Sequence, residues 1–362
     1  MRTAFAILIG LHGTIHLFGF LKAFEIIRFN ALTQHIPKAT GVFWLIAFGL
    51  LSTACIAYLS NYKYWWFLSL AGILISQLLI FFYWKDARFG TLPNIIILLV
   101  TVHAFASYSF SNKIAEERKE MLALGTSKNP VLTEAEIEDL PKPVKTWLYQ
   151  SGMMEKKIPT SVYLEQEILM KLKPDQKDWT PAGADQYFTL NPPAFNWKVR
   201  LKSNPLMPIA GRDKFVNGQG TMTIKLFSLF DVAHAENEPK IDQASLQRYL
   251  AEISWFPLAA VSPFIAWQSI DEHSASATLS YNGTQGSGIF YFDNDGNFDR
   301  FEALRYMDVS DDSPTPWVVK VLKTETLDGT KVPTELVATW ILAEKEWTWL
   351  KLKVTRLNYQ FN

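Results

Sequence analysis

The stretch DQASLQRYLAEISWFPLAA, residues 242–260, is the one clear helical pattern in a region that otherwise alternates like β-strands. Asp242 is a typical N-cap residue and Pro257 cannot continue a helix, so we expect a helix between them. Four residues recur at helical spacing and so lie on one side of that helix, namely Leu246, Tyr249, Leu250 and Ile253. The stretch therefore predicts one main helix that packs its apolar side against a sheet.

The segments on both sides of this helix alternate between apolar and polar residues, which predicts β-strands. Examples are SVYLEQEILMKL, FNWKVRLK, TMTIKLF, SASATLSY, GIFYF and WTWLKLKVTRLNY. Asn217-Gly218, Asn282-Gly283 and Asp295-Gly296 are typical of hairpin turns. We expect about ten strands, mostly antiparallel, in a soluble domain over residues 143–362. A large antiparallel sheet with one helix often curls into a cup or open barrel that holds one apolar ligand.

Residues 1–111 have a different character, because they contain the long apolar runs of the chain. Four segments, at residues 3–21, 41–60, 64–84 and 92–110, are each close to the ~20 residues that cross a bilayer. Aromatic residues gather at the segment ends, as at membrane interfaces. The first segment has no cleavage site and should remain as a helix. We therefore expect a four-helix membrane domain over residues 1–111, a helical connector over 112–142, and then the soluble domain.

The side of the membrane that carries the soluble domain is not set by charge. Four crossings place the N-terminus and everything after the fourth helix on one side, and Lys and Arg are balanced between the two sides. A Trp-rich strand domain attached to a bilayer suits the bacterial envelope. We therefore expect an inner-membrane protein with an extracytoplasmic soluble domain.

Charge and cysteine content exclude several classes of protein. Lys plus Arg and Asp plus Glu both number 35, and no basic block stands out, which argues against a nucleic-acid partner. Cys55 is the single cysteine, so no intramolecular disulfide can form. No Ser-His-Asp or Cys-His set is visible, and the sequence identifies neither a cofactor nor an oligomeric state.

Histidines inside the apolar segments are informative, because polar groups are costly in a bilayer. His12 and His16 share one face of the first helix, and His103 lies in the fourth helix. One interpretation is a haem, metal or quinone site formed by these three residues. The other is that they form hydrogen bonds between helices, with Gly10, Gly13 and Gly19 allowing close approach.

Several motifs of the soluble half together resemble an uncharacterised bacterial family, a domain of unknown function, over roughly residues 140–350. They are LPKPVKTWLYQSG, NPPAFNW, GRDKFVNGQGTM, LQRYLAEISWFPLAA, WQSIDEHSASATL and GIFYFDNDGNFDRFEALRY. The resemblance implies a shared fold and no particular activity. Family members read PPGF where this chain has Ala194, which loses a glycine turn position.

The central helix also carries the candidate site. Arg248 and Glu252 are four residues apart, which is consistent either with a surface ion pair or with a pair at the mouth of the cup. In the second case they would hold a polar head group, or a carboxylate beside a phenol would perform acid–base chemistry. The candidate ligand-binding residues are Arg248, Tyr249, Glu252, Trp255, Phe256, Asp271, Arg305 and Tyr306.

Our leading hypothesis from the sequence is a membrane-anchored protein whose β-rich domain binds a lipid or another apolar ligand. Its partners would be the bilayer and that ligand. The alternatives are a membrane-surface enzyme that uses Arg248, Tyr249 and Glu252, or a haem or quinone protein that uses the three intramembrane histidines. We expect a binding protein rather than an enzyme.

Overall fold

The computed structural model describes residues 2–27, 32–126, 130–202 and 207–361. The chain divides into two compact units, unit 1 at residues 1–112 and unit 2 at residues 113–362. The helices of unit 1 are α1 (Arg2–Ala23), α2 (Lys38–Leu59), α3 (Trp65–Phe82), the short α4 (Trp84–Ala87) with η1 (Arg88–Gly90), and α5 (Thr91–Leu124), which continues into unit 2.

Within the described residues, four helical spans are long and apolar enough to cross a membrane, as the sequence predicted, and the fourth runs from α4 through α5. Their outward-facing side chains are apolar, with Leu11 63% and Phe81 62% exposed. A helix that is apolar on its exposed side is typical of a lipid-facing surface. A Cβ on Gly19 would lie 2.3 Å from the Trp44 ring, so this glycine lets α1 and α2 approach closely.

Unit 2 is built on an antiparallel sheet of thirteen strands within the described residues. In spatial order they run β6-β5-β4-β3-β2-β1-β13-β12-β11-β10-β9-β8-β7. Their bounds are β1 (Ser161–Met170), β2 (Thr180–Thr189), β3 (Ala194–Leu201), β4 (Ile209–Val216), β5 (Gln219–Leu226), β6 (Phe230–Glu236), β7 (Ile265–Ser269), β8 (Ser274–Tyr281), β9 (Thr284–Phe292), β10 (Phe298–Arg305), β11 (Thr315–Leu327), β12 (Thr330–Ile341) and β13 (Glu346–Gln360).

The expected large, curled antiparallel sheet is confirmed, although the expected number of about ten strands is too low. The edge strands β6 and β7 are short, and β2 contains Pro181 and Gly183, which are poor strand formers. Strand pairing supplies what the local sequence lacks, because β2 is held by β1 on one side and β3 on the other.

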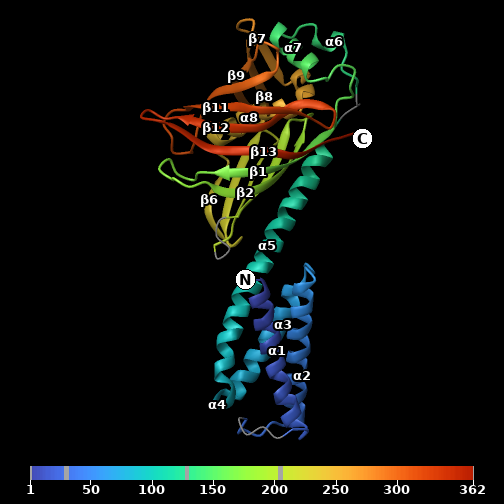
Figure 1. The fold of residues 1–362 in the computed structure, drawn as a ribbon, viewed down its shortest axis with the longest axis vertical. Helices are drawn as coiled ribbons and strands as arrows, with labels where there is room; N and C mark the ends of the chain where they lie inside the picture. Colours follow the sequence, from blue (N-terminus) through green and yellow to red (C-terminus); the bar gives the residue numbers. More distant parts are fainter. Residues whose placement is uncertain (1, 28–31, 127–129, 203–206, 362) are drawn as a thin grey trace. The chain divides into compact units, whose positions relative to one another are not determined.

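The main helix α8 (Pro239–Glu252) lies against the face around which the sheet curls, and we call this the concave face (Figure 1). It contacts β4 and β5 from one arm of the sheet and β8, β9 and β10 from the other. Gly220 on β5 and Gly286 on β9 permit this fit, because a Cβ would lie 2.5 Å from Ser245 Oγ and 2.8 Å from Gln247 Cγ. The helix therefore bridges the two arms.

The two arms also meet through their hairpin turns. Asn217-Gly218 and Asn282-Gly283 adopt positive φ angles, as their sequence predicted for tight turns. Thr284 Oγ1 donates a hydrogen bond to the Gly218 carbonyl at 2.7 Å. The sheet remains open, because β6 and β7 at its ends do not pair with each other.

The helix boundaries differ from the prediction. α8 begins at Pro239 with Glu238 at the N-cap position, and Asp242 instead accepts a hydrogen bond from the Gly220 N–H at 2.7 Å. Proline is well tolerated in the first turn, where its missing N–H is not needed. The helix ends at Glu252, and two 3-10 turns follow, η2 (Ile253–Trp255) and η3 (Pro257–Val261).

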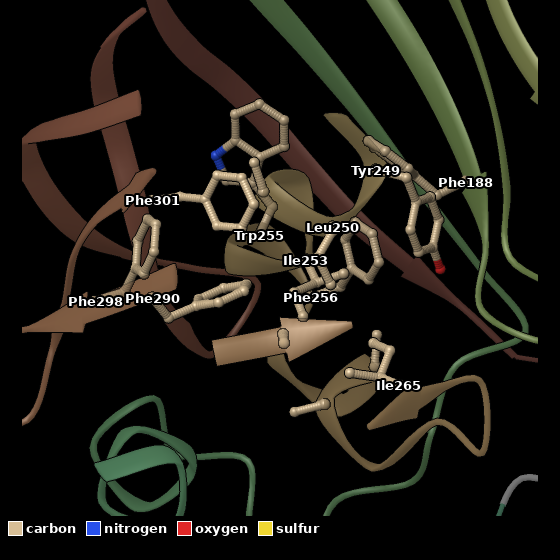
Figure 2. Packing of buried hydrophobic residues seen from close by; sticks show 14 of the residues in the cluster. Phe188, Tyr249, Leu250, Ile253, Trp255, Phe256, Ile265, Phe290, Phe298 and Phe301 are labelled. Atoms are coloured by element: carbon tan, nitrogen blue, oxygen red, sulfur yellow. The ribbon is translucent and has the colours of Figure 1, made fainter. Parts of the chain in front are cut away.

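The core of unit 2 lies between α8, the two 3-10 turns and the concave face (Figure 2). Phe256 is fully buried, and its ring centroid lies 4.7 Å from that of Phe188 and 5.7 Å from that of Tyr249. Phe290 and Phe301 bring the opposite arm into the same cluster, with centroids 5.0 Å apart. The buried and contacting rings show that this half of the concave face is a packed core. Truncating such a ring to alanine typically costs about 3–5 kcal/mol.

After α5, unit 2 continues with two short helices, α6 (Glu134–Ile137) and α7 (Lys142–Gln150). Thr133 and Glu136 form the expected capping box. The last turns of α5 lie on the opposite, convex face of the sheet. There Glu117 pairs with Arg212 of β4 at 3.2 Å, and Arg212 is only 3% exposed.

Candidate functional site

A partly buried charged cluster lies where α8 meets the concave face, and we call it the Arg248 cluster. Arg248 Nη1 is 2.6 Å from Asp213 Oδ2 on β4, and Arg248 Nε is 2.9 Å from Glu252 Oε1. Gln186 Nε2 on β2 donates to Glu252 Oε2 at 2.8 Å. The guanidinium carbon lies 4.7 Å from the ring centroid of Trp197 on β3. One cation is thus held by two carboxylates and an aromatic face.

Burial and the neighbouring charges together shift the pKa values of this cluster. Burial opposes the charged form of Arg248, but Glu252 and Asp213 outweigh it and raise its pKa. Burial also raises the pKa of the Glu252 carboxyl, and the Arg248 guanidinium offsets only part of that effect. The side chains of Arg248 and Glu252 are 16% and 11% exposed, so this is a shielded ion pair and not the surface pair of one sequence interpretation.

Arg305, at the end of β10, lies beside this cluster on the concave face. Its Nε donates to the Ala244 carbonyl of α8 at 2.9 Å. Its guanidinium carbon is 4.8 Å from the Trp317 ring centroid and 5.6 Å from that of Trp340. Burial lowers the pKa of Arg305 to about 10. The structure therefore brings together Arg248, Glu252 and Arg305, three of the predicted site residues.

Three other predicted residues lie in the core. The Tyr249 hydroxyl donates to the Thr189 carbonyl at 2.9 Å, and burial raises the pKa of this phenol. The Trp255 Nε1–H donates to the Pro333 carbonyl at 3.0 Å, and Phe256 is fully buried. These side chains are 2% exposed or less, so they support the floor of the site from within.

Asp271 and Tyr306 are not part of the Arg248 cluster. Asp271 lies in the exposed turn between β7 and β8, where it accepts a hydrogen bond from the His273 N–H at 2.8 Å. Tyr306 follows β10, and Lys240 Nζ lies 5.4 Å from its ring centroid at the start of α8. Asp271 therefore has a local role in its turn, and Tyr306 has one at the start of α8.

Sequence reasoning missed Asp213 and Gln186, although a signal for both exists. In β4 the positions that face inward alternate through Gly211, Asp213 and Phe215, and in β2 Gln186 precedes the buried Phe188 by two residues. A polar residue at an inward position of a strand needs a buried partner. Here Arg248 is that partner for both.

Beyond the Arg248 cluster the concave face is apolar but is not covered by α8. A second cluster of buried residues, including Ile168, Ala182 and Val199, is formed by strands β1, β2, β3 and β13 and includes no residue of α8. Around this second cluster lie further apolar side chains that are only partly buried or are exposed. We call the surface they form the open half of the concave face. These side chains are Trp197, Leu201, Ile209, Met222, Ile224, Leu226, Phe230, Trp347, Trp349, Leu350 and Leu352.

The convex face of the same strands has the opposite character. The alternate positions, which point away from the open half, carry charged and exposed side chains such as Glu167, Arg200, Lys351 and Lys353. A sheet with water on both faces should be polar on both. The open half therefore has the composition of a surface that is covered by something apolar.

A separate pocket of about 700 Å³ lies at another edge of unit 2. It is formed by the end of α5, the start of β1, the β2–β3 turn and η3. Its lining includes Ile158, Leu190, Leu258 and Val261. Its size and apolar lining are suitable for a small ligand. Its lining includes no residue of the Arg248 cluster.

In unit 1, His12 and His16 form hydrogen bonds that join three helices. His12 Nε2 donates to Asn94 Oδ1 of α5 at 2.8 Å, and His16 Nε2 lies 2.8 Å from Ser76 Oγ of α3. His16 Nδ1 donates to the His12 carbonyl at 2.8 Å. This geometry matches the hydrogen-bonding interpretation. His103 is partly buried on α5 and has interactions of its own.

No group of three or more His, Cys, Asp or Glu side chains in residues 2–27, 32–126, 130–202 and 207–361 is arranged to hold a metal ion. His12 and His16 together supply only two imidazoles, and three of their nitrogens are already engaged.

Comparison with known proteins gives a family but no activity. A crystal structure of a LolA superfamily protein, NE2245 from Nitrosomonas europaea, is similar with a TM-score of 0.34 and 10% sequence identity, over 64% of this chain and 96% of that one. No curated protein matches the sequence. Residues 130–352 match the model of a family of unknown function, DUF6544. Because this match covers more than half of the chain, the protein belongs to the DUF6544 family.

Proposed function

We propose that this protein binds a lipid or another apolar ligand on the open half of the concave face. The observation that carries the proposal is the contrast between the two faces of one sheet, apolar on the uncovered concave side and charged on the convex side. Exposed apolar surface costs about 25 cal/mol per Å² relative to burial, so a ligand that covers this surface gains that free energy.

The four helices of unit 1 give the proposal its setting. They are long and apolar enough to span a membrane. We propose that they anchor the chain in the bacterial inner membrane with unit 2 on the extracytoplasmic side. A binding domain anchored in this way would exchange its ligand with a bilayer.

The test is a substitution on the open half. Leu226 is partly exposed at the end of β5 and faces the concave side. The amount of lipid extracted from the L226E variant should be at least about five-fold lower than that from the wild type. The reason is that an acyl chain on this surface would bury the new carboxylate without a partner. The measurement is native mass spectrometry of the full chain released from detergent, followed by organic extraction and lipid analysis.

A matched control separates this effect from general loss of apolar surface. Leu304 is 60% exposed on β10, at a position that alternates with the inward-facing Ala303 and Arg305. The L304E variant should retain the wild-type amount of lipid. Equal retention by all three proteins would refute ligand binding on the open half. Loss in V261E instead of L226E would assign the ligand to the pocket beside η3.

A further inference from the structure

Arg305 is a fixed cation with unused hydrogen-bond donors. Its Nε donates to the Ala244 carbonyl, and its guanidinium carbon lies within cation–π distance of two tryptophan rings. Within the described residues it makes no ion pair, and its two terminal nitrogens donate to no protein acceptor. An arginine held in one orientation is suited to bind the oxygens of a carboxylate or phosphate.

Arg248 does not have the same capacity, although it lies nearby. Its Nη1 donates to Asp213, its Nε donates to Glu252, and its Nη2 lies 3.5 Å from Gln186 Oε1. The two carboxylates of the Arg248 cluster favour the charged form of Arg305 from beyond ion-pair distance. They offset part of the burial that lowers the pKa of Arg305 to about 10, but they occupy none of its donors.

A second and independent observation concerns the tryptophans beside Arg305. The Nε1–H of Trp317, a residue that is only 5% exposed, is buried without an acceptor among the described residues. The same holds for Trp347 and Trp349 on β13. Trp317 pairs with Trp340 across β11 and β12, and Trp340 pairs with Trp347 across β12 and β13. Several donors without acceptors therefore gather on this part of the concave face, and buried donors without partners are rare.

We propose that the ligand of the open half is an anionic amphiphile, whose carboxylate or phosphate oxygens are bound by the terminal nitrogens of Arg305 while its apolar chain lies along the strands toward Trp349. This inference rests on the proposed function and specifies its ligand class. The same face supplies both parts of the site, because Arg305 contacts the tryptophan row from which the apolar surface of β13 continues.

The experiment compares two probes of equal chain length, one with an anionic head group and one with a neutral head group. The full chain in nanodiscs is titrated calorimetrically with decanoate and with decanol at pH 8, with empty nanodiscs as the baseline and acetate as a probe for binding of the free anion. The wild type should bind decanoate at least about ten-fold more tightly than decanol, because only the carboxylate can form an ion pair with Arg305 and accept two parallel hydrogen bonds from it. In R305Q the Kd of decanoate should rise to that of decanol.

Two further variants complete the test. Arg300 lies on the same strand but pairs with Glu302 on the convex side, so R300Q should keep the full preference for decanoate. R305K keeps a cation, so it should keep part of the preference for decanoate over decanol. If R305Q unfolds at a lower temperature than the wild type, R305K still reports the effect of the charge. Equal binding of both probes by the wild type, or an unchanged preference in R305Q, would overturn this inference alone. Binding of acetate as tightly as decanoate would assign the site to a free anion and overturn it too. No binding of either amphiphile would overturn the proposed function itself.

Discussion

The spacing of Arg248 and Glu252 is typical of a surface ion pair, which contributes a few tenths of a kcal/mol. Their position inside the curl of the sheet changes this estimate. Asp213 and Gln186 complete a shielded network, and each partner then depends on the others for its hydrogen bonds. Removing one partner from such a network leaves a charge without its counter-ion, which costs more than the pair contributes on a surface.

At the residue scale we therefore expect E252Q to lower the stability of unit 2 by about 1–3 kcal/mol. The amide keeps the shape of the side chain but removes one of the two charges that hold Arg248. Thermal or denaturant unfolding measures the change. E302Q is the control, because Glu302 pairs with Arg300 at a site about one-third exposed and should cost less than about 1 kcal/mol.

The E252Q variant also distinguishes a structural role of Glu252 from the catalytic role of the enzyme alternative. A carboxylate that is present for catalysis alone would leave the unfolding transition of E252Q at its wild-type position. That result would contradict the structural role assigned to Glu252 here. A destabilised E252Q that still binds decanoate would agree with it.

At the scale of elements, α8 depends on glycines in the strands that it touches. β5 and β9 belong to different arms of the sheet, and each carries a glycine where the helix passes. A side chain at either position would push the helix away from the sheet. Because α8 contacts both arms, we expect these positions to affect the shape of the concave face as well as its stability.

We predict that G220A lowers the free energy of unfolding of unit 2 by about 1–3 kcal/mol, as overpacking does in other cores. The new Cβ would lie 2.7 Å from the Ile241 carbonyl oxygen, a backbone atom that cannot move aside cheaply. Denaturant unfolding measures the loss. G183A in β2 is the matched control, because its Cβ would meet only the flexible end of Lys202 at 3.3 Å. Equal stability of the two variants would show that α8 does not need the close approach.

At the scale of the whole molecule, the chain combines a unit whose helices are long and apolar enough to span a membrane with a unit whose sheet has one apolar and one charged face. The compartment of unit 2 decides which lipids or amphiphiles it can meet. Because the chain has one cysteine, Cys55, a single introduced thiol reports that compartment directly.

We expect a C55S/E344C variant to react with a membrane-impermeant maleimide in intact spheroplasts. Glu344 is exposed in the turn between β12 and β13, so its replacement leaves the fold intact. Permeabilised spheroplasts give the total reactive thiol, and C55S alone gives the background. Labelling that appears only after permeabilisation would place unit 2 in the cytoplasm and contradict the proposed orientation.

The sequence by itself determined the features that depend on local composition and period. Runs of about 20 apolar residues fixed the four membrane-capable helices, alternation and Asn-Gly turns fixed most strands, and the spacing of Leu246 and Ile253 fixed the buried side of α8. The edge strands β6 and β7, and β2 with its proline and glycine, were missed because pairing with neighbours supplies their stability. Arg248, Glu252 and Arg305 were found as candidates, whereas Tyr249, Trp255 and Phe256 belong to the core.

Only the tertiary structure decided which partners these residues have. Asp213 and Gln186 come from strands more than thirty residues before Arg248 in the sequence, and the register of β2, β3 and β4 places them on one row. Local sequence patterns also did not determine how much of the sheet α8 covers. The structure shows that the helix covers one half of the concave face and leaves the other half open. Side-chain direction is a local property of a strand, but what covers a face depends on how the whole sheet curls.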